Sequence, residues 1–147
     1  MEQTKAKSKN RKKALRIVFA VGILLTAMIL LLSRGKDDGV STLEGRQIFL
    51  GELGWEVDPT SEDMRIVQLP EVLEGMLNDY NEIQLKQGYD LSKHLGETCQ
   101  QYCYRVTNYP DQSQTVLVTL YIQGDRVIAG DVHSTALKGF LQGLKQE

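Results

Sequence analysis

The sequence predicts a small α+β domain that follows one N-terminal transmembrane helix. Three observations support this fold class. An uncharged run occupies residues 17–32, and two segments with apolar residues at steps of three and four come after it. Three segments with alternating apolar residues then complete the chain. Two helices followed by an antiparallel meander indicate a domain in which the helices cover one face of the sheet.

The run at 17–32 is predicted to cross a membrane as a helix. Its only polar side chain is the weakly polar Thr26, and the helix rises about 24 Å. A start at Ala14 would bring the span close to the ~30 Å of a bilayer core. A cleaved signal peptide is the alternative, but no small-residue cleavage site follows the run. The predicted anchor residues are Ile17, Leu24, Leu25, Ile29 and Leu32.

The charges beside this run predict its orientation. Seven Lys or Arg residues precede it, whereas only Arg34 and Lys36 follow it closely. Basic residues are retained on the cytoplasmic side, so residues 1–16 are predicted to form a cytoplasmic arm and the C-terminal part to lie outside. A nucleic-acid-binding arm is disfavoured because cations beside a membrane segment commonly set topology. The main predicted topology determinants are Lys9, Arg11, Lys12, Lys13 and Arg16.

The part of the chain after the run is acidic. It holds ten Lys or Arg and eighteen Asp or Glu residues, a net charge of −8, against −2 for the whole chain. Such a domain does not attract polyanions by bulk electrostatics, so no nucleic-acid partner is predicted. Residues 33–40 are polar and without periodicity, which predicts a linker. Residues 41–147 are then long enough for one small domain.

The first helix of the domain is predicted from a capping box at its start. Ser41 is the expected cap, and Glu44 lies three positions later. Apolar residues recur at near-helical spacing as far as Leu53, and Gly54 is expected to end the helix in a left-handed conformation. Two short strands are predicted next, at 55–59 and 65–69, because each alternates and is stopped by a proline.

The main helix is predicted over Glu71–Gln87. Apolar residues there recur at steps of three and four, with Pro70 at the entrance and Gly88 at the exit. The segment 89–96 is rich in turn-forming residues and is predicted to be a structured loop or one helical turn. Its two leucines, Leu91 and Leu95, are expected to pack under the fold.

Three strands are predicted at 98–109, 115–123 and 126–134, joined by a loop at 110–114 and a tight Gly124-Asp125 turn. Both faces of the middle strand are apolar, which predicts partial cover on the second face. The segment 135–144 is predicted to be a short amphipathic ending.

A distinctive pattern between Leu43 and Leu144 is carried by residues 49–50, 54–59, 69–71, 80–81, 87–91, 102–110, 130–132 and 139–144. This pattern resembles the bacterial family known as domain of unknown function 4830. This resemblance implies a small exported domain behind an N-terminal anchor, and it implies no known activity. Cys99, Cys103 and His133 depart from the family's pattern.

Candidate residues for chemistry are few. Cys99 and Cys103 are the only thiols, and their spacing on a strand places them about 13 Å apart, too far for a disulfide with each other. A zinc site would need two further ligands, for which only His94 and His133 are available. Asp131 and His133 share a strand face and could form a proton-handling pair. No cofactor or metal site is predicted.

Two hypotheses for function follow from these observations. The first is a non-catalytic binding or accessory module of the cell envelope, a single-pass membrane protein that recognises an envelope protein or ligand. The second is an exported thiol or redox sensor, or a small enzyme, that uses Cys99, Cys103 or His133. The first is favoured because the sequence contains no recognisable catalytic constellation.

Overall fold

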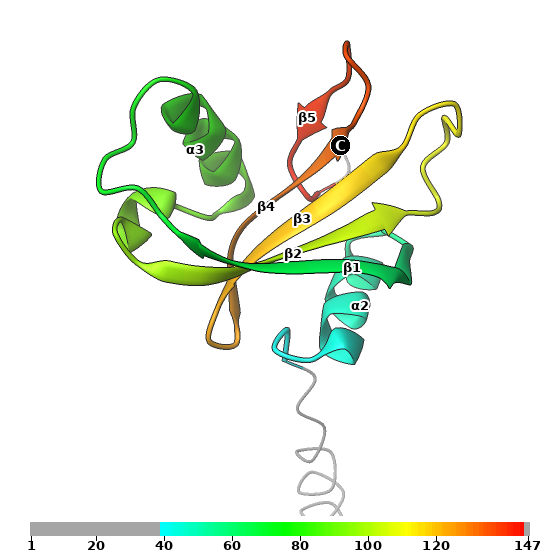
Figure 1. Cartoon of the computed structure of the whole chain (residues 1–147), viewed down its shortest axis with the longest axis horizontal. Helices are drawn as coiled ribbons and strands as arrows, with labels where there is room; N and C mark the ends of the chain where they lie inside the picture. The colour runs from blue at the N-terminus through cyan, green and yellow to red at the C-terminus, as the bar shows by residue number, and fades with distance from the viewer. Residues whose placement is uncertain (1–38, 146–147) are drawn as a thin grey trace, which may run out of the picture. The chain divides into compact units, whose positions relative to one another are not determined.

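The computed structural model describes residues 39–145, and within them the fold is α+β (Figure 1). The predicted fold class is confirmed at this level. The transmembrane helix predicted at 17–32 lies outside the described residues, as do the predicted cytoplasmic arm and most of the predicted linker. Inside the described range no helix is long and apolar enough to cross a membrane. The elements are α2 (Leu43–Glu52), β1 (Val57–Gln68), α3 (Met76–Gln87), the 3₁₀ helix η2 (Leu91–His94), β2 (Thr98–Val106), β3 (Val116–Gln123), β4 (Arg126–Ser134) and β5 (Leu141–Gln142).

The five strands form one antiparallel sheet whose order, β1-β2-β3-β4-β5, is the order of the chain. The predicted meander is thereby confirmed. β1 corrects another prediction, because a single long strand replaces the two short strands expected at 55–59 and 65–69. Pro59 does not end the strand, because it lies in an irregularity between Asp58 and Asp63. An edge strand tolerates proline at such a place, since no ladder hydrogen bond is lost there.

Helix α2 is capped one residue later than predicted. The side chain of Thr42, not that of Ser41, accepts a hydrogen bond of 3.0 Å from the Gly45 N–H. At the other end the chain leaves the helix through Gly54, whose φ of 86° is the left-handed conformation that the sequence predicts.

Helix α3 starts at Met76, five residues after the predicted start. The preceding segment is held by β-type contacts instead, because Leu69 N–H donates to Glu97 O and Gly96 N–H donates to Pro70 O. Gly75, with a φ of 54°, then turns the chain into the helix. The predicted exit is confirmed, since Gly88 is the left-handed C-cap with a φ of 93°.

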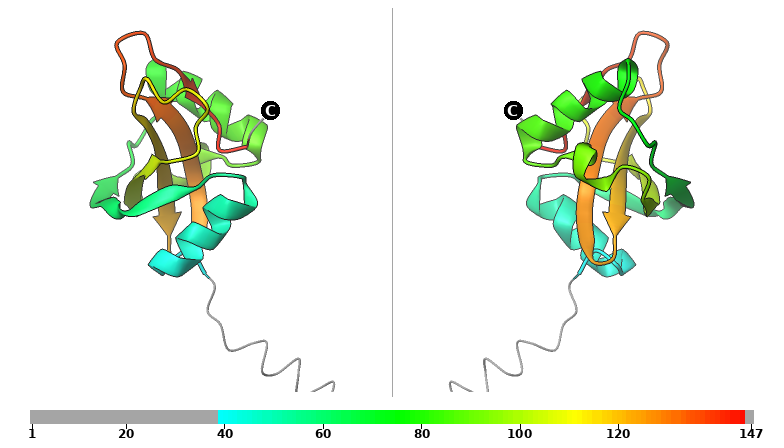
Figure 2. Two further views of the ribbon diagram at one scale, coloured as in Figure 1. Left: turned by 90° about the vertical axis from the view of Figure 1, so that its right-hand side faces the viewer. Right: turned by 90° about the vertical axis from the view of Figure 1, so that its left-hand side faces the viewer.

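The two helices contact opposite faces of the sheet, so the prediction that they cover one face is wrong. The α2 face is defined here as the sheet face that carries Tyr104, Val118 and Leu120, together with every second residue along the same strands. Leu50 of α2 packs on this face. The α3 face carries Thr119, Tyr121 and Asp131, and Tyr80 of α3 reaches it. Figures 1 and 2 show α2 and α3 on the two sides of the strands. The expected partial cover of the second face is confirmed.

Each face has its own hydrophobic cluster. The larger cluster lies on the α2 face, and Leu144 from the chain end joins it. The smaller one lies at the other end of the sheet, where Leu91 of η2 packs on Cys99 and Ala129. The amphipathic ending predicted at 135–144 is only partly regular: β5 spans two residues, Leu144 is buried and Leu137 is fully exposed.

A buried arginine fastens α2 to the sheet. Nε of Arg46 donates to the Tyr104 hydroxyl at 2.6 Å, and Nη2 donates to Glu62 Oε2 at 2.8 Å. Nη1 donates to the carbonyl oxygens of Val40 and Ser41 at 3.0 and 2.9 Å. The guanidinium also lies 3.7 Å from the centre of the Tyr102 ring. One side chain therefore joins the entry segment, helix α2, β1 and β2.

Candidate functional site

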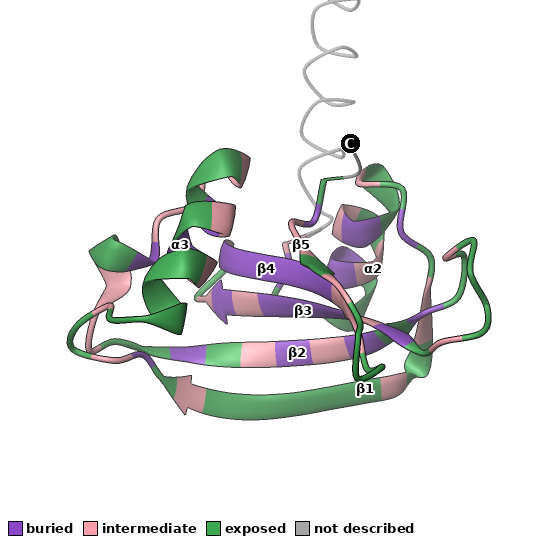
Figure 3. Ribbon diagram, turned by 90° about the horizontal axis from the view of Figure 1, so that it is seen from above, coloured by how far each residue is buried: buried purple, intermediate pink, exposed green. Residues whose placement is uncertain are grey.

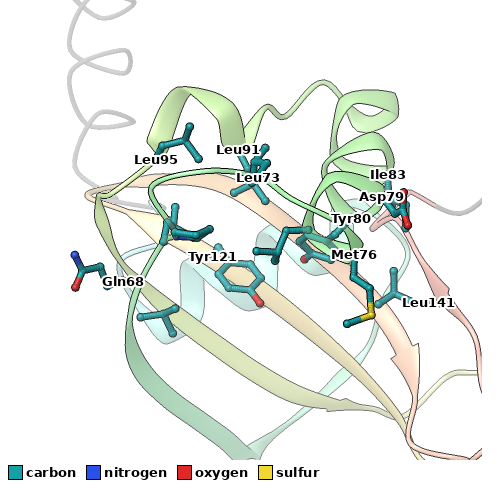
Figure 4. A pocket seen from close by; sticks show the side chains of 14 residues that line it. Gln68, Leu73, Met76, Asp79, Tyr80, Ile83, Leu91, Leu95, Tyr121 and Leu141 are labelled. Atoms are coloured by element: carbon teal, nitrogen blue, oxygen red, sulfur yellow. The ribbon is translucent and has the colours of Figure 1, made fainter.

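One hollow in the described residues is an apolar groove of about 660 Å³ between α3, the segment before it and the sheet (Figure 4). This volume lies within the range of ligand sites in proteins. Leucine, isoleucine, methionine and tyrosine side chains form most of its wall. The lining residues are Val67, Gln68, Leu69, Pro70, Leu73, Met76, Leu77, Asp79, Tyr80, Ile83, Leu91, Leu95, Tyr121 and Leu141.

The groove stays open because α3 is held at the edge of the sheet and not flat on it. At Gly130, β4 has no strand neighbour on its outer side, and two glutamines of α3 take that place. Gln84 Oε1 accepts from the Gly130 N–H at 2.9 Å, and Gln87 Nε2 donates to Gly130 O at 3.1 Å. An added Cβ at Gly130 would lie 2.6 Å from Leu144 Cδ1, so the small residue also allows the chain end to pack closely.

The mouth of the groove exposes large apolar side chains. Met76 is 87% exposed and Leu77 is 44% exposed, although both are on α3 and line the groove. Exposed methionine is adaptable in shape and is common on surfaces that bind peptides. A groove with such a mouth can accept an apolar side chain or a short amphipathic segment.

A polar cluster lies beside the floor of the groove. Tyr80 donates a hydrogen bond of 2.7 Å to Asp131 Oδ2, and His133 Nδ1 lies 2.8 Å from Asp131 Oδ1. Asp131 is buried, whereas His133 is about 30% exposed. The ring of Tyr80 meets that of Tyr121 edge to face at 6.3 Å. The predicted Asp131–His133 pair is thus confirmed as a contact.

The electrostatics of this cluster stabilise the protonated forms of His133 and of the two tyrosines. The hydrogen bond to Asp131 raises the pKa of His133, and burial only partly offsets it. Burial, and then the charge of Asp131, raises the pKa of Tyr80 far above its usual range. Burial also raises the pKa of Tyr121. These groups hold a proton well, but none is activated as a nucleophile.

The His133–Asp131 contact should make stability depend on pH. Because the pKa of His133 is raised in the folded state, its contribution should be complete below pH ~6.5 and should be lost as pH rises through the folded pKa. Urea unfolding of the wild type and His133→Gln should therefore differ most at about pH 5.5 and least at about pH 8.5. A constant difference over this range would contradict the assignment.

The two cysteines lie on the α3 face and are not joined to each other, as predicted. Cys99 is buried in the cluster that contains Leu91 and Ala129, while Cys103 lies opposite Thr119. Burial raises the pKa of both thiols. A thiol with a raised pKa carries little thiolate at neutral pH and reacts slowly. The arrangement therefore gives the redox hypothesis no activated thiol among the described residues.

This arrangement predicts slow and unequal thiol reactivity. In the folded protein at pH 7, a maleimide should modify Cys103 more slowly than glutathione and should modify Cys99 only after unfolding. Mass spectrometry with and without urea measures both rates. Rapid labelling of Cys99 without urea would show that its surroundings are more open than described.

The structure describes only some of the other residues that the sequence singles out. His94 is paired with an acidic side chain, since its Nδ1 lies 2.9 Å from Glu97 Oε2. Among residues 39–145, no three His, Cys, Asp or Glu side chains come together as a metal site. All predicted anchor residues and topology determinants, from Lys9 to Leu32, lie outside the described residues.

The groove itself was not predicted from the sequence. The sequence predicts its leucines and Ile83 as apolar positions of a strand, the main helix, a loop and the amphipathic ending. The structure instead leaves Met76 and Leu77 exposed at the mouth of a groove. A possible signal was the number of apolar residues in 69–95, which exceeds what one helix face can bury.

Comparisons with known proteins add one finding. The family described as Domain of unknown function (DUF4830) matches residues 49–132, which is more than half of the chain. The match begins inside α2 and ends in β4, so it includes most of the groove and Asp131. No curated protein and no solved structure matches the chain.

Proposed function

This chain belongs to the DUF4830 family, and we propose that its domain is a non-catalytic binding module of the cell envelope. The groove between α3 and the sheet would receive an amphipathic, basic segment of a partner protein. The N-terminal helix predicted at 17–32 would hold the domain at the outer face of the membrane.

The observation that carries this proposal is the apolar groove with exposed residues at its mouth. Folded domains generally bury large apolar side chains, and a cluster of exposed ones often marks an interaction surface. Met76 and Leu77 lie on the same helix as the buried contacts that dock α3, so the helix is firmly placed while part of it remains uncovered. A pre-formed groove of this kind loses little conformational entropy when it is filled.

The charge around the groove favours a basic partner. The segment 71–82, which forms one side of it, contains Glu71, Glu74, Asp79 and Glu82 and no lysine or arginine. All four side chains are exposed, and Asp79 lines the groove. Such a rim attracts lysine and arginine side chains and repels anionic lipids. A basic amphipathic segment fits both the apolar floor and the acidic rim.

A site-specific crosslink tests the groove. A photoreactive amino acid at Met76 of the full chain in intact cells should capture a partner protein reproducibly. The same residue at Leu137 is the matched control, because Leu137 is fully exposed but does not line the groove. Charge reversal of Asp79 and Glu82 to lysine should weaken the Met76 crosslink. Equal capture from both positions, or no effect of the reversal, would contradict the proposal.

The predicted topology has its own test. A membrane-impermeant maleimide should label Leu137→Cys in intact cells and should label Ser8→Cys, in the predicted cytoplasmic arm, only after lysis. The native thiols should give little background because Cys99 is buried and both pKa values are raised. The reverse pattern would place the domain in the cytoplasm.

A small enzyme is the second candidate function, and the contact of His133 with Asp131 is the observation that favours it. Oriented by a buried carboxylate, a partly exposed histidine can act as a general base. Changing His133 to Gln and both cysteines to Ala, without a change in the cellular phenotype, would remove this candidate.

A further inference from the structure

The edge of β1 is an exposed edge of the sheet in the described domain. Within residues 39–145, β1 pairs with β2 alone, and its outer side carries no strand (Figure 3). Met64 and Ile66 are 48% and 72% exposed on the α2 face of this edge. An unpaired edge with exposed apolar side chains is a template for adding a further strand.

The backbone of this edge is free to pair over the segment 63–68. Leu69 N–H points toward β2, since it donates to Glu97 O at 2.8 Å. Alternation along a strand then directs the N–H and C=O groups of Met64, Ile66 and Gln68 away from β2. The earlier half of β1 is protected by Pro59 and the irregularity beside it.

The charges on this segment are complementary to those of a second, antiparallel copy of the same segment. Asp63 and Arg65 are exposed on the α3 face, where they form an ion pair of 2.6 Å. If two copies of the strand pair antiparallel about Met64, each Asp63 lies opposite the partner's Arg65, and the two Met64 side chains meet. Pairing about Arg65 would instead place two arginines opposite each other, which is unfavourable.

We infer that the β1 edge joins two copies of this chain, with the two-fold axis at Met64, so that two five-stranded sheets become one. This surface is separate from the groove, and the inference does not depend on the proposed function. Two new ion pairs and two Met64 backbone hydrogen bonds support the contact.

Disulfide crosslinking of the full chain in native membranes tests the register. In a background with Cys99→Ala and Cys103→Ser, Met64→Cys should form a covalent dimer under mild oxidation. Directly opposite residues in a hydrogen-bonded pair have Cα atoms about 5.5 Å apart, which suits a disulfide. Gln68→Cys is the matched control, since its two copies would lie about 27 Å apart along the strands.

Charge exchange provides the second measurement. Asp63→Arg should reduce the Met64→Cys dimer roughly tenfold, because two attractions become repulsions. Adding Arg65→Asp should restore it, since the exchanged charges are again complementary. Both side chains are exposed, so neither change should affect folding. Equal crosslinking at 64 and 68, no effect of Asp63→Arg, or no restoration would each overturn the inference.

Discussion

Replacing Arg46 with methionine should lower the free energy of unfolding by about 3 kcal/mol, because it leaves a partly buried carboxylate without its cation. Glu62 keeps 31% of its side chain exposed, which places the effect at the lower end of values for buried pairs. The carbonyl groups of Val40 and Ser41 would also lose their donor. Urea-dependent proteolysis of the full chain in lipid nanodiscs measures the change.

The matched control is Arg105→Met. Arg105 lies on β2 and is exposed, so its loss should change stability by less than about 0.5 kcal/mol. Adding Glu62→Gln to Arg46→Met should recover part of the loss, since the unpaired charge is then removed. If Arg105→Met costs as much as Arg46→Met, the buried contacts of Arg46 are not the cause.

Replacing Trp55 with alanine should cost about 3–5 kcal/mol, the usual range for a buried aromatic residue in a core. Trp55 is 4% exposed within the cluster on the α2 face, and its Nε1–H donates to Leu144 O at 2.5 Å. Leu144 in turn packs against Gly130, and its N–H donates to Gln87 of α3. The substitution should therefore also loosen the chain end and the neighbouring Leu141 of the groove.

Trp55→Phe separates the loss of the buried ring from the loss of the hydrogen bond to Leu144. It keeps a buried ring but removes the donor to Leu144, so it should cost less than alanine while still exposing the chain end. Amide hydrogen exchange at 141–145, beside the unfolding measurement, reports this difference. Unchanged exchange in Trp55→Phe would show that the hydrogen bond does not hold the chain end.

Much of the sheet could be predicted because its later strands depend on local pattern. Alternation in β3 and β4 and the Gly124-Asp125 turn between them are sequence signals of a hairpin, and both strands were correctly located. The same alternation placed Asp131 and His133 on one face, where they are in contact.

The errors arose where distant segments decide the conformation. β1 continues past Pro59 because β2, which lies about thirty residues further on, supplies its partners. Residues 71–75 have helical spacing, yet contacts of Leu69 and Pro70 with 96–97 delay α3. Arginine is usually a surface residue, so the burial of Arg46 is not evident from the sequence. Only the fold brings Tyr104 and Glu62 to it. The groove escaped prediction for the same reason, since five separate segments line it.

The agreement between strand order and chain order has a consequence for the kinetics of folding. When the chain is synthesised from its N-terminus, β3, β4 and β5 can each pair with the strand that precedes it in the sequence. No strand has to be inserted between two others. β1 is the exception, since it must wait for β2 while residues 69–97 are closed into a loop. Closure of that loop should limit the folding rate, and the later hairpins should form quickly after it.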